Sequence, residues 1–271
     1  GSNSLKALTS GDGNVAIGRD SGEALTGGGY AVMLGYQAGE ATTGTSYHVL
    51  IGTEAGMAGD ITNHGAVAIG YRAGKALTSG ANNTFVGYES GDAVTTGHSN
   101  TFLGKTSGGA TETASGSVFL GYAAGGAVTT GNANIAIGDG AMNNATTGNW
   151  NIAIGLAAGD ALTSGWGNIL TGKGAGGALN SGARNVILGH EAGASITTGY
   201  LNVIIGYQAA DSSLTGTSNV IIGARSLGTA DGAERNNVCI GTDVMASVNN
   251  DKADSNIAIG NDSLTGGTGG L

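Results

Sequence analysis

The stretch "SNVIIGARS", Ser218 to Ser226, places three apolar residues in a row directly before a glycine. Near-copies recur along the chain, such as "NVAIGRDS" from Asn14, "NTFVGYES" from Asn83 and "NIAIGLAA" from Asn151. We take the glycine after each apolar triplet as the anchor glycine. Fifteen copies follow one another from Gly18 to Gly260 at steps of 17 residues, with 18 or 19 at three places. A fixed period of this length is typical of a solenoid, so the sequence predicts one repeat domain over residues 1–271.

The columns of the repeat indicate β-structure. The residue three places before the anchor glycine is β-branched in every copy, which favours strand over helix. Seven places after the glycine stands a second apolar column, as in Leu25, Leu77 and Val94. The column pattern therefore predicts that each repeat forms a strand, a glycine turn, a short second strand and another turn. The predicted fold is all-β, a parallel β-solenoid or β-roll of about fifteen 17-residue coils.

Asparagine occupies the position four places before the anchor glycine in eleven copies. In stacked coils this column becomes a ladder of like side chains. A buried turn amide can then bond to the backbone and to the asparagine of the next coil.

The composition excludes several classes of protein. The chain contains 55 Gly and no Pro among 271 residues, without the strict third-position glycine of collagen. Its formal net charge of −9 disfavours nucleic acid as a partner. No apolar run approaches the length of a membrane span, so membrane insertion is not expected.

The middle residue of each triplet is apolar in every copy. Because side chains alternate faces along a strand, we expect the first and third members to point into the coil and the middle member to point outward. An outward apolar stripe marks an interface, and the simplest partner is another copy of the chain. The predicted trimer interface comprises Met33, Leu50, Phe85, Phe102, Phe119, Leu170, Ile187, Ile204, Ile221 and Cys239.

Strands of the type "NVAIG" (Asn14 to Gly18), followed by a small residue three places on, resemble the head repeats of YadA-like trimeric autotransporter adhesins. The resemblance covers nearly the whole chain, although the repeats of that family are shorter. The longer form "NTFVGYESGDAVTTG" (Asn83 to Gly97) is similar to repeats in phage and other viral tail fibres. The resemblance implies a homotrimer of β-rolls in a fibre or adhesin that attaches to a host or surface. It also implies an extracellular location, on a virion or a bacterial cell surface.

The sequence predicts no enzyme, no cofactor and no metal site. "GKGAGG" (Gly172 to Gly177) fits a dinucleotide fingerprint but is one repeat corner in a glycine-rich chain. The four histidines lack metal-ligand spacing. A groove built by long loops would favour a glycan-processing enzyme, but the insertions are short, near residues 59–63, 231–235 and 249–254.

A rank of threonines, one in most repeats, supports an alternative hypothesis. Residues such as Thr26, Thr78 and Thr163 would suit a monomeric ice-binding solenoid.

Both tryptophans of the chain fall in the loop before the strand, in neighbouring repeats. Flat aromatic surfaces suit sugar rings, so Trp150, Trp166 and Tyr200 are predicted as a possible glycan contact.

Overall fold

A computed structural model describes residues 1–44, 46–212, 215–228, 234–246 and 254–265. These residues divide into two compact units, residues 1–134 and 135–271, which are described separately. Both units are all-β and consist of stacked coils with a spacing of about 17 residues, so the predicted parallel β-solenoid is confirmed for each.

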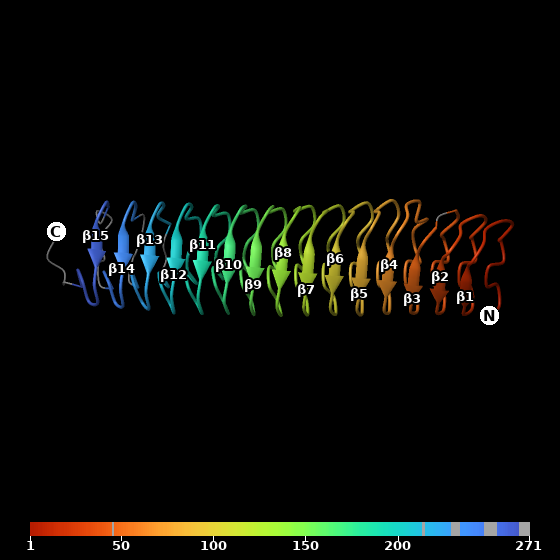
Figure 1. The fold of residues 1–271 in the computed structure, drawn as a ribbon, viewed down its shortest axis with the longest axis horizontal. Coiled ribbons are helices and arrows are strands. Elements are labelled where there is room, and N and C mark those ends of the chain that lie inside the picture. The colour runs from red at the N-terminus through yellow and green to blue at the C-terminus, as the bar shows by residue number, and fades with distance from the viewer. Residues whose placement is uncertain (45, 213–214, 229–233, 247–253, 266–271) are drawn as a thin grey trace. The chain divides into compact units, whose positions relative to one another are not determined.

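Each coil contributes one strand of three residues (Figure 1). Unit 1 contains β1 (Val15–Ile17), β2 (Val32–Leu34), β3 (Val49–Ile51), β4 (Val67–Ile69), β5 (Thr84–Val86), β6 (Thr101–Leu103) and β7 (Val118–Leu120). Unit 2 contains β8 (Ile135–Ile137), β9 (Ile152–Ile154), β10 (Ile169–Thr171), β11 (Val186–Leu188), β12 (Val203–Ile205), β13 (Val220–Ile222), β14 (Val238–Ile240) and β15 (Ile257–Ile259). Within each unit, neighbouring strands pair in parallel and in equal register, so every sequence column becomes a spatial row.

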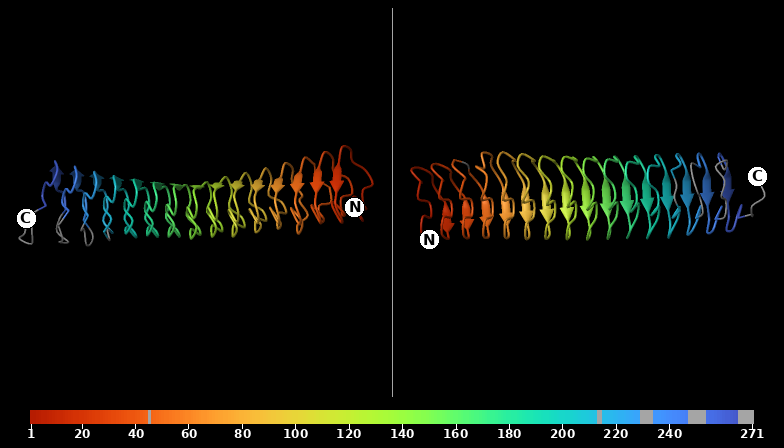
Figure 2. Two further views of the ribbon diagram at one scale, coloured as in Figure 1. Left: turned by 90° about the horizontal axis from the view of Figure 1, so that it is seen from below. Right: turned by 180° about the vertical axis from the view of Figure 1, so that it is seen from behind.

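The predicted second strand of each coil is not formed in the described residues. The segment after the anchor glycine turns repeatedly, because residues such as Glu89 (φ 51°) and Gly91 (φ 59°) lie in the left-handed region. An extended strand cannot contain such residues. The coils still bond to one another there, as where the Thr78 amide donates to the Thr95 carbonyl over 2.9 Å. Within each unit the strands lie on one side of the coils and these turns on the other (Figure 2).

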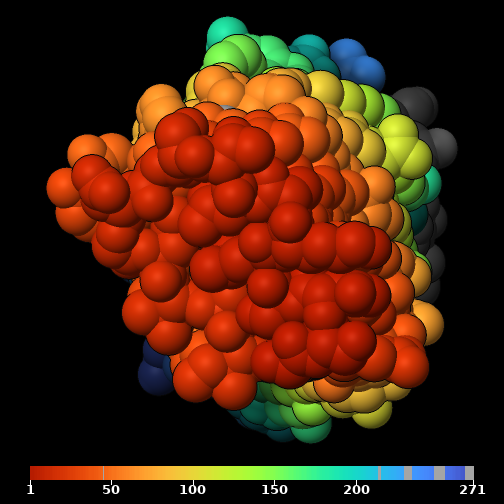
Figure 3. Space-filling view, turned by 90° about the vertical axis from the view of Figure 1, so that its right-hand side faces the viewer, coloured from red at the N-terminus to blue at the C-terminus, as the bar shows by residue number. Residues whose placement is uncertain are grey.

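The middle residue of each triplet points into the coil, not outward. The strands share a pattern in which the middle side chain is more buried than its two neighbours, and the ten residues predicted at a trimer interface are buried within a single chain. That prediction is therefore wrong for Met33, Leu50, Phe85, Phe102, Phe119, Leu170, Ile187, Ile204, Ile221 and Cys239. The physical reason is the narrowness of the coil, which admits one inward side chain per three-residue strand. Figure 3 shows the N-terminal end of unit 1 as a face of closely packed atoms.

The middle column and the position four residues after the anchor glycine fill the core together. Where the middle residue is Phe102, that position is Gly108, and a Cβ built on Gly108 would lie 2.5 Å from the Phe102 ring. Where the middle residue is Ala136, the position holds the buried Met142. The second apolar column is buried as expected, for example at Leu77 and Leu162. The middle column and the second apolar column thus belong to one close-packed core.

The asparagine ladder is confirmed in unit 2. From Asn168 to Asn256, each side-chain Nδ2 donates to Oδ1 of the asparagine one coil earlier over 3.0–3.3 Å. Each backbone amide donates to the same oxygen, as Asn185 N does to Asn168 Oδ1 over 3.0 Å. Most of the side-chain Nδ2 groups also donate to a turn carbonyl, as Asn185 Nδ2 does to Gly199. A buried polar column is stable only when it is satisfied in this way.

The core position of the middle column predicts the effect of truncating Phe102. Its ring stacks on Phe85 and Phe119 at centroid distances of 5.2 and 4.6 Å. We expect Phe102→Ala to lower the free energy of local unfolding by about 3–5 kcal/mol, measured by hydrogen exchange at the amides of β5 to β7. The outward neighbour is the control, and Thr101→Ala should cost less than about 1 kcal/mol. Equal losses in the two variants would contradict the assignment of faces.

The ladder predicts a second contrast. Asn185→Ala removes two donors and leaves the buried Asn202 amide without its acceptor. We expect a loss of about 2–3 kcal/mol in the stability of β11 and β12, since unpaired buried polar groups are costly. Asn180→Ala is the matched control, because the Asn180 side chain is exposed and, within the described part of the chain, accepts only from Thr163 Oγ1. A loss of more than about 1 kcal/mol in the control would argue against the ladder as the cause.

Candidate functional site

The outer face of the strands is apolar along each unit. It is formed by the first and third residues of every triplet, which we call the outer columns. Of their thirty positions, Thr84, Thr101 and Thr171 are threonine and the rest are Val, Ile or Leu. Several are openly exposed, including Leu120, Ile154 and Ile169. No charged residue interrupts the outer columns.

An outer face of this kind departs from an ordinary solvated sheet. Antiparallel sheets with one wet face alternate apolar and polar residues, whereas strands that are apolar on both faces are buried on both. A contiguous apolar patch of this extent is typical of an interaction surface. The outward apolar stripe is therefore not the middle column that the sequence predicted but the two outer columns beside it.

The three predicted glycan-contact residues lie at one edge of unit 2. Trp150, Trp166 and Tyr200 are 64%, 40% and 51% exposed. Trp166 and Tyr200 occupy one column two coils apart, and Trp150 stands in the adjacent column one coil before Trp166. The guanidinium of Arg184 lies 4.3 Å from the centre of the Trp166 ring. We call these four residues the indole edge.

The tyrosines that follow the anchor glycine pack among their neighbours. Tyr71 and Tyr88 stack at 5.0 Å, and the Lys105 ammonium lies 5.7 Å from both Tyr88 and Tyr122. Tyr207 stacks on His190 at 5.5 Å. These rings cover side chains of adjacent coils, which is the simpler of their possible roles.

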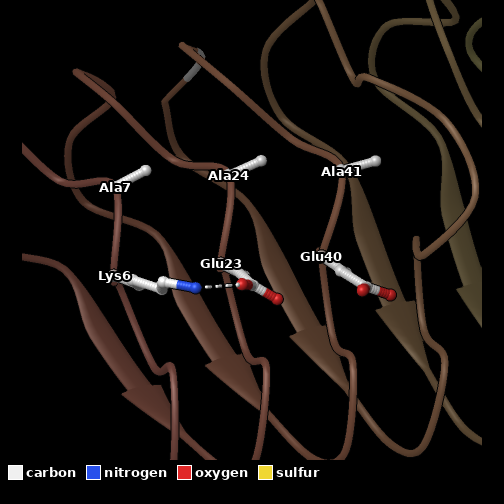
Figure 4. Close-up of a pocket in the computed structure, with 6 residues that line it drawn as sticks. All are labelled: Lys6, Ala7, Glu23, Ala24, Glu40 and Ala41. Carbon is white, nitrogen blue, oxygen red and sulfur yellow. Dashed lines mark hydrogen bonds and ion pairs between the residues drawn. The ribbon is translucent and has the colours of Figure 1, made fainter.

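The acidic column five places after the anchor glycine borders a shallow hollow in unit 1. Figure 4 shows Lys6, Glu23 and Glu40 from three successive coils, with Lys6 Nζ 3.2 Å from Glu23 Oε1. Elsewhere in the column, burial raises the pKa of Asp92 and of Asp160. Within the described ranges, no group of three or more His, Cys, Asp or Glu side chains is placed to hold a metal ion.

The threonine rank bonds to the backbone of the next coil. Thr26 Oγ1 donates to the Thr43 carbonyl over 2.9 Å, and Thr78 and Thr146 repeat this bond with Thr95 and Thr163. These hydroxyls therefore serve the contacts between coils. The alternative of an ice-binding face gains no support from them.

One of the three predicted loop insertions lies wholly within the described residues. Around residues 59–63, Asp60 accepts from the amide and hydroxyl of Thr43, and Ile61 is buried. This insertion is therefore bonded to the coil that precedes it. The insertions near 231–235 and 249–254 fall mostly outside the described residues.

His48 takes the place of asparagine in the ladder of unit 1. Its Nδ1 accepts from the Ala66 amide over 3.3 Å, as an asparagine oxygen would. Burial, and secondarily the nearby His64, lowers the pKa of His48 to about 4. Cys239 is another buried titratable group; burial raises its pKa to about 11, and its Sγ lies 3.3 Å from Met245 Sδ. Neither residue has the exposure of a reactive group.

No protein-family model, curated protein or solved structure matches the chain. Among the described residues, no helix is long and apolar enough to cross a membrane.

The lowered pKa of His48 predicts a loss of stability in acid. The unfolded chain takes up a proton near pH 6.5, whereas the folded chain resists protonation down to about pH 4. Stability of unit 1 should therefore fall as the pH drops from 6.5 to 4, by about 2–3 kcal/mol from this group. His48→Asn should remove that fall. The measurement is hydrogen exchange of β2 to β4 at pH 7 and pH 4, with the exposed His98→Asn as the control. An equal acid loss in the chain and in His48→Asn would contradict the assignment.

Proposed function

We propose that this chain is a non-enzymatic structural segment of a trimeric fibre or adhesin. Its role is to build a stable assembly that attaches a virion or a bacterial cell to a host or surface. The observation that carries the proposal is the apolar outer face, which is free of charge along the outer columns of both units. Its location is then extracellular, on a virion fibre or a cell surface.

A second copy of the chain is the partner that suits this face best. The face is a row of aliphatic residues that repeats at about 4.8 Å, the spacing of hydrogen-bonded strands. A partner must cover it coil by coil, and another copy has the same repeat by construction. Closed symmetric assemblies of identical chains are the commonest way to bury such a face.

The number of chains rests on the resemblance of the repeats to trimeric adhesin heads and tail-fibre repeats. Three chains of 26.1 kDa around a common axis would each bury their outer columns. The asparagine ladder and the stacked core of each coil support a mechanical role, because a coil that opens still has neighbours that hold its register.

The proposal predicts the mass in solution. Light scattering of the purified chain should give about three times 26.1 kDa. Two charges on the outer face, Ile154→Glu with Ile205→Glu, should dissociate the assembly, because burying unpaired carboxylates is costly. The separated chains should keep their strands, since both side chains point away from the core.

The matched control is Thr147→Glu, which adds a charge at an exposed turn in the same unit. It should leave the mass unchanged. A monomeric parent chain would overturn the proposal, and a dimer would keep association through the outer face while rejecting the threefold arrangement.

A further inference from the structure

We propose that the indole edge of unit 2 binds an acidic saccharide, meaning a sugar chain that carries carboxylate groups. The inference goes beyond the structural role, because an assembly can form through the outer columns without any ligand. It rests on how Trp150, Trp166, Arg184 and Tyr200 are held, on which ring faces are open, and on the local charge.

The backbone holds the indole edge rigidly. The Gly167 amide donates to the Asn149 carbonyl over 3.0 Å, and the Arg184 amide donates to the Trp166 carbonyl over 3.0 Å. Tyr200 makes an isolated parallel bridge with Thr217. Trp150 and Arg184 both lie in the left-handed region, with φ of 56° and 58°. A backbone fixed in this way has little entropy to lose when a ligand binds.

The aromatic faces at this edge are less occupied than at the corresponding edge of unit 1. There, Tyr30 and Tyr47 stand in the column of Trp150 and stack on each other at 5.6 Å with an interplanar angle of 4°. Among the described residues, no aromatic ring stacks on Trp150, Trp166 or Tyr200. Arg184 covers one face of Trp166. The remaining indole surface is open to a sugar ring.

Gly167 leaves open space beside the two indoles. It stands one coil after Trp150 and one coil before Arg184 in the same column. Apart from its chain neighbours Trp166 and Asn168, a Cβ built on Gly167 would meet only Cγ of Arg184, at 3.7 Å. A larger residue would fill the position between the Trp150 and Arg184 side chains. The absence of a side chain there gives a ligand access to both.

The charge of the edge favours an anion. The chain has a formal net charge of −9, yet the two columns that form the edge carry no acidic residue from Asn149 to Ser218. Arg184 is their one cation over that range. A guanidinium held over an aromatic ring still presents its N–H groups at the rim, where it can bond a carboxylate.

The spacing suits a chain of sugars better than a single one. Trp166 and Tyr200 are two coils apart, about 10 Å at the spacing of paired strands. Each ring can stack under one sugar of an extended oligosaccharide. Arg184, which lies in the coil between them, would pair with a carboxylate of the sugar that bridges the two rings.

The test uses the intact chain with three probes: an oligogalacturonate hexamer, sialyllactose and the neutral maltohexaose. Both tryptophans of the chain lie at this edge, so intrinsic fluorescence reports binding directly. We expect a saturable change with an acidic probe and an affinity for maltohexaose at least about tenfold weaker. The difference between the first two probes identifies a uronate or a sialic acid as the recognised sugar.

Variants locate the site by calorimetry. Trp150→Ala with Trp166→Ala should weaken acidic-probe binding by about tenfold or more, and Arg184→Gln should abolish the preference over the neutral probe. Tyr47→Ala, which alters the same column in unit 1, should bind like the parent. All variants should keep the parent mass, so failure here is distinct from failure of assembly. No binding of either acidic probe, equal binding of the neutral one, or unchanged binding in the double variant would overturn the proposal.

Discussion

The close approach of successive anchor glycines is the constraint on which the rest of each unit depends. Gly87 has φ of 141°, and a Cβ built on it would lie 2.3 Å from the carbonyl oxygen of Gly104 in the next coil. A side chain at this point would force the coils apart and break the ladder of hydrogen bonds. The strand therefore ends at the same residue in every coil, and the repeat length follows from the return path to that glycine.

A strand of three residues that ends at such a corner sends one side chain inward. The core of each coil is then built from that residue and the columns opposite it. Each phenylalanine of the middle column has a glycine across from it, as Phe102 and Gly108 illustrate. The same geometry sends two aliphatic side chains outward. The outer face is apolar because the two outward residues of nearly every strand are Val, Ile or Leu, which suit a strand that is covered on both faces.

The repeat, the first strand of each coil and the asparagine ladder could be predicted from the sequence, because each depends on a column that is uniform in chemistry. The second strand was wrongly predicted, because the segment after the anchor glycine turns repeatedly. The facing of the triplet could not be deduced from alternation alone, since alternation allows either the middle residue or its two neighbours to be inside. A signal was present in the exceptions. Threonine occurs in the outer columns at Thr84, Thr101 and Thr171, whereas the middle column has no hydroxyl. A second signal lies in two coils: Phe102 is matched by Gly108, whereas Ala136 is matched by Met142. Such matching indicates that the middle residue and its partner share the core.

The predicted glycan contact had a weaker basis, because exposure of an aromatic residue depends on neighbours that lie 17 residues away. Tyr30 and Trp150 hold the same position in the repeat, yet Tyr30 stacks on Tyr47 one coil later, while Trp150 is followed by Gly167. The anchor glycines, the core and the outer columns are each restricted to one kind of residue. The edge columns are not, and they accept Tyr, Trp, Arg, Gly or Ser without disturbing the coil. If the edge binds a ligand as we propose, its specificity can change through these columns without altering the anchor glycines, the core or the outer columns.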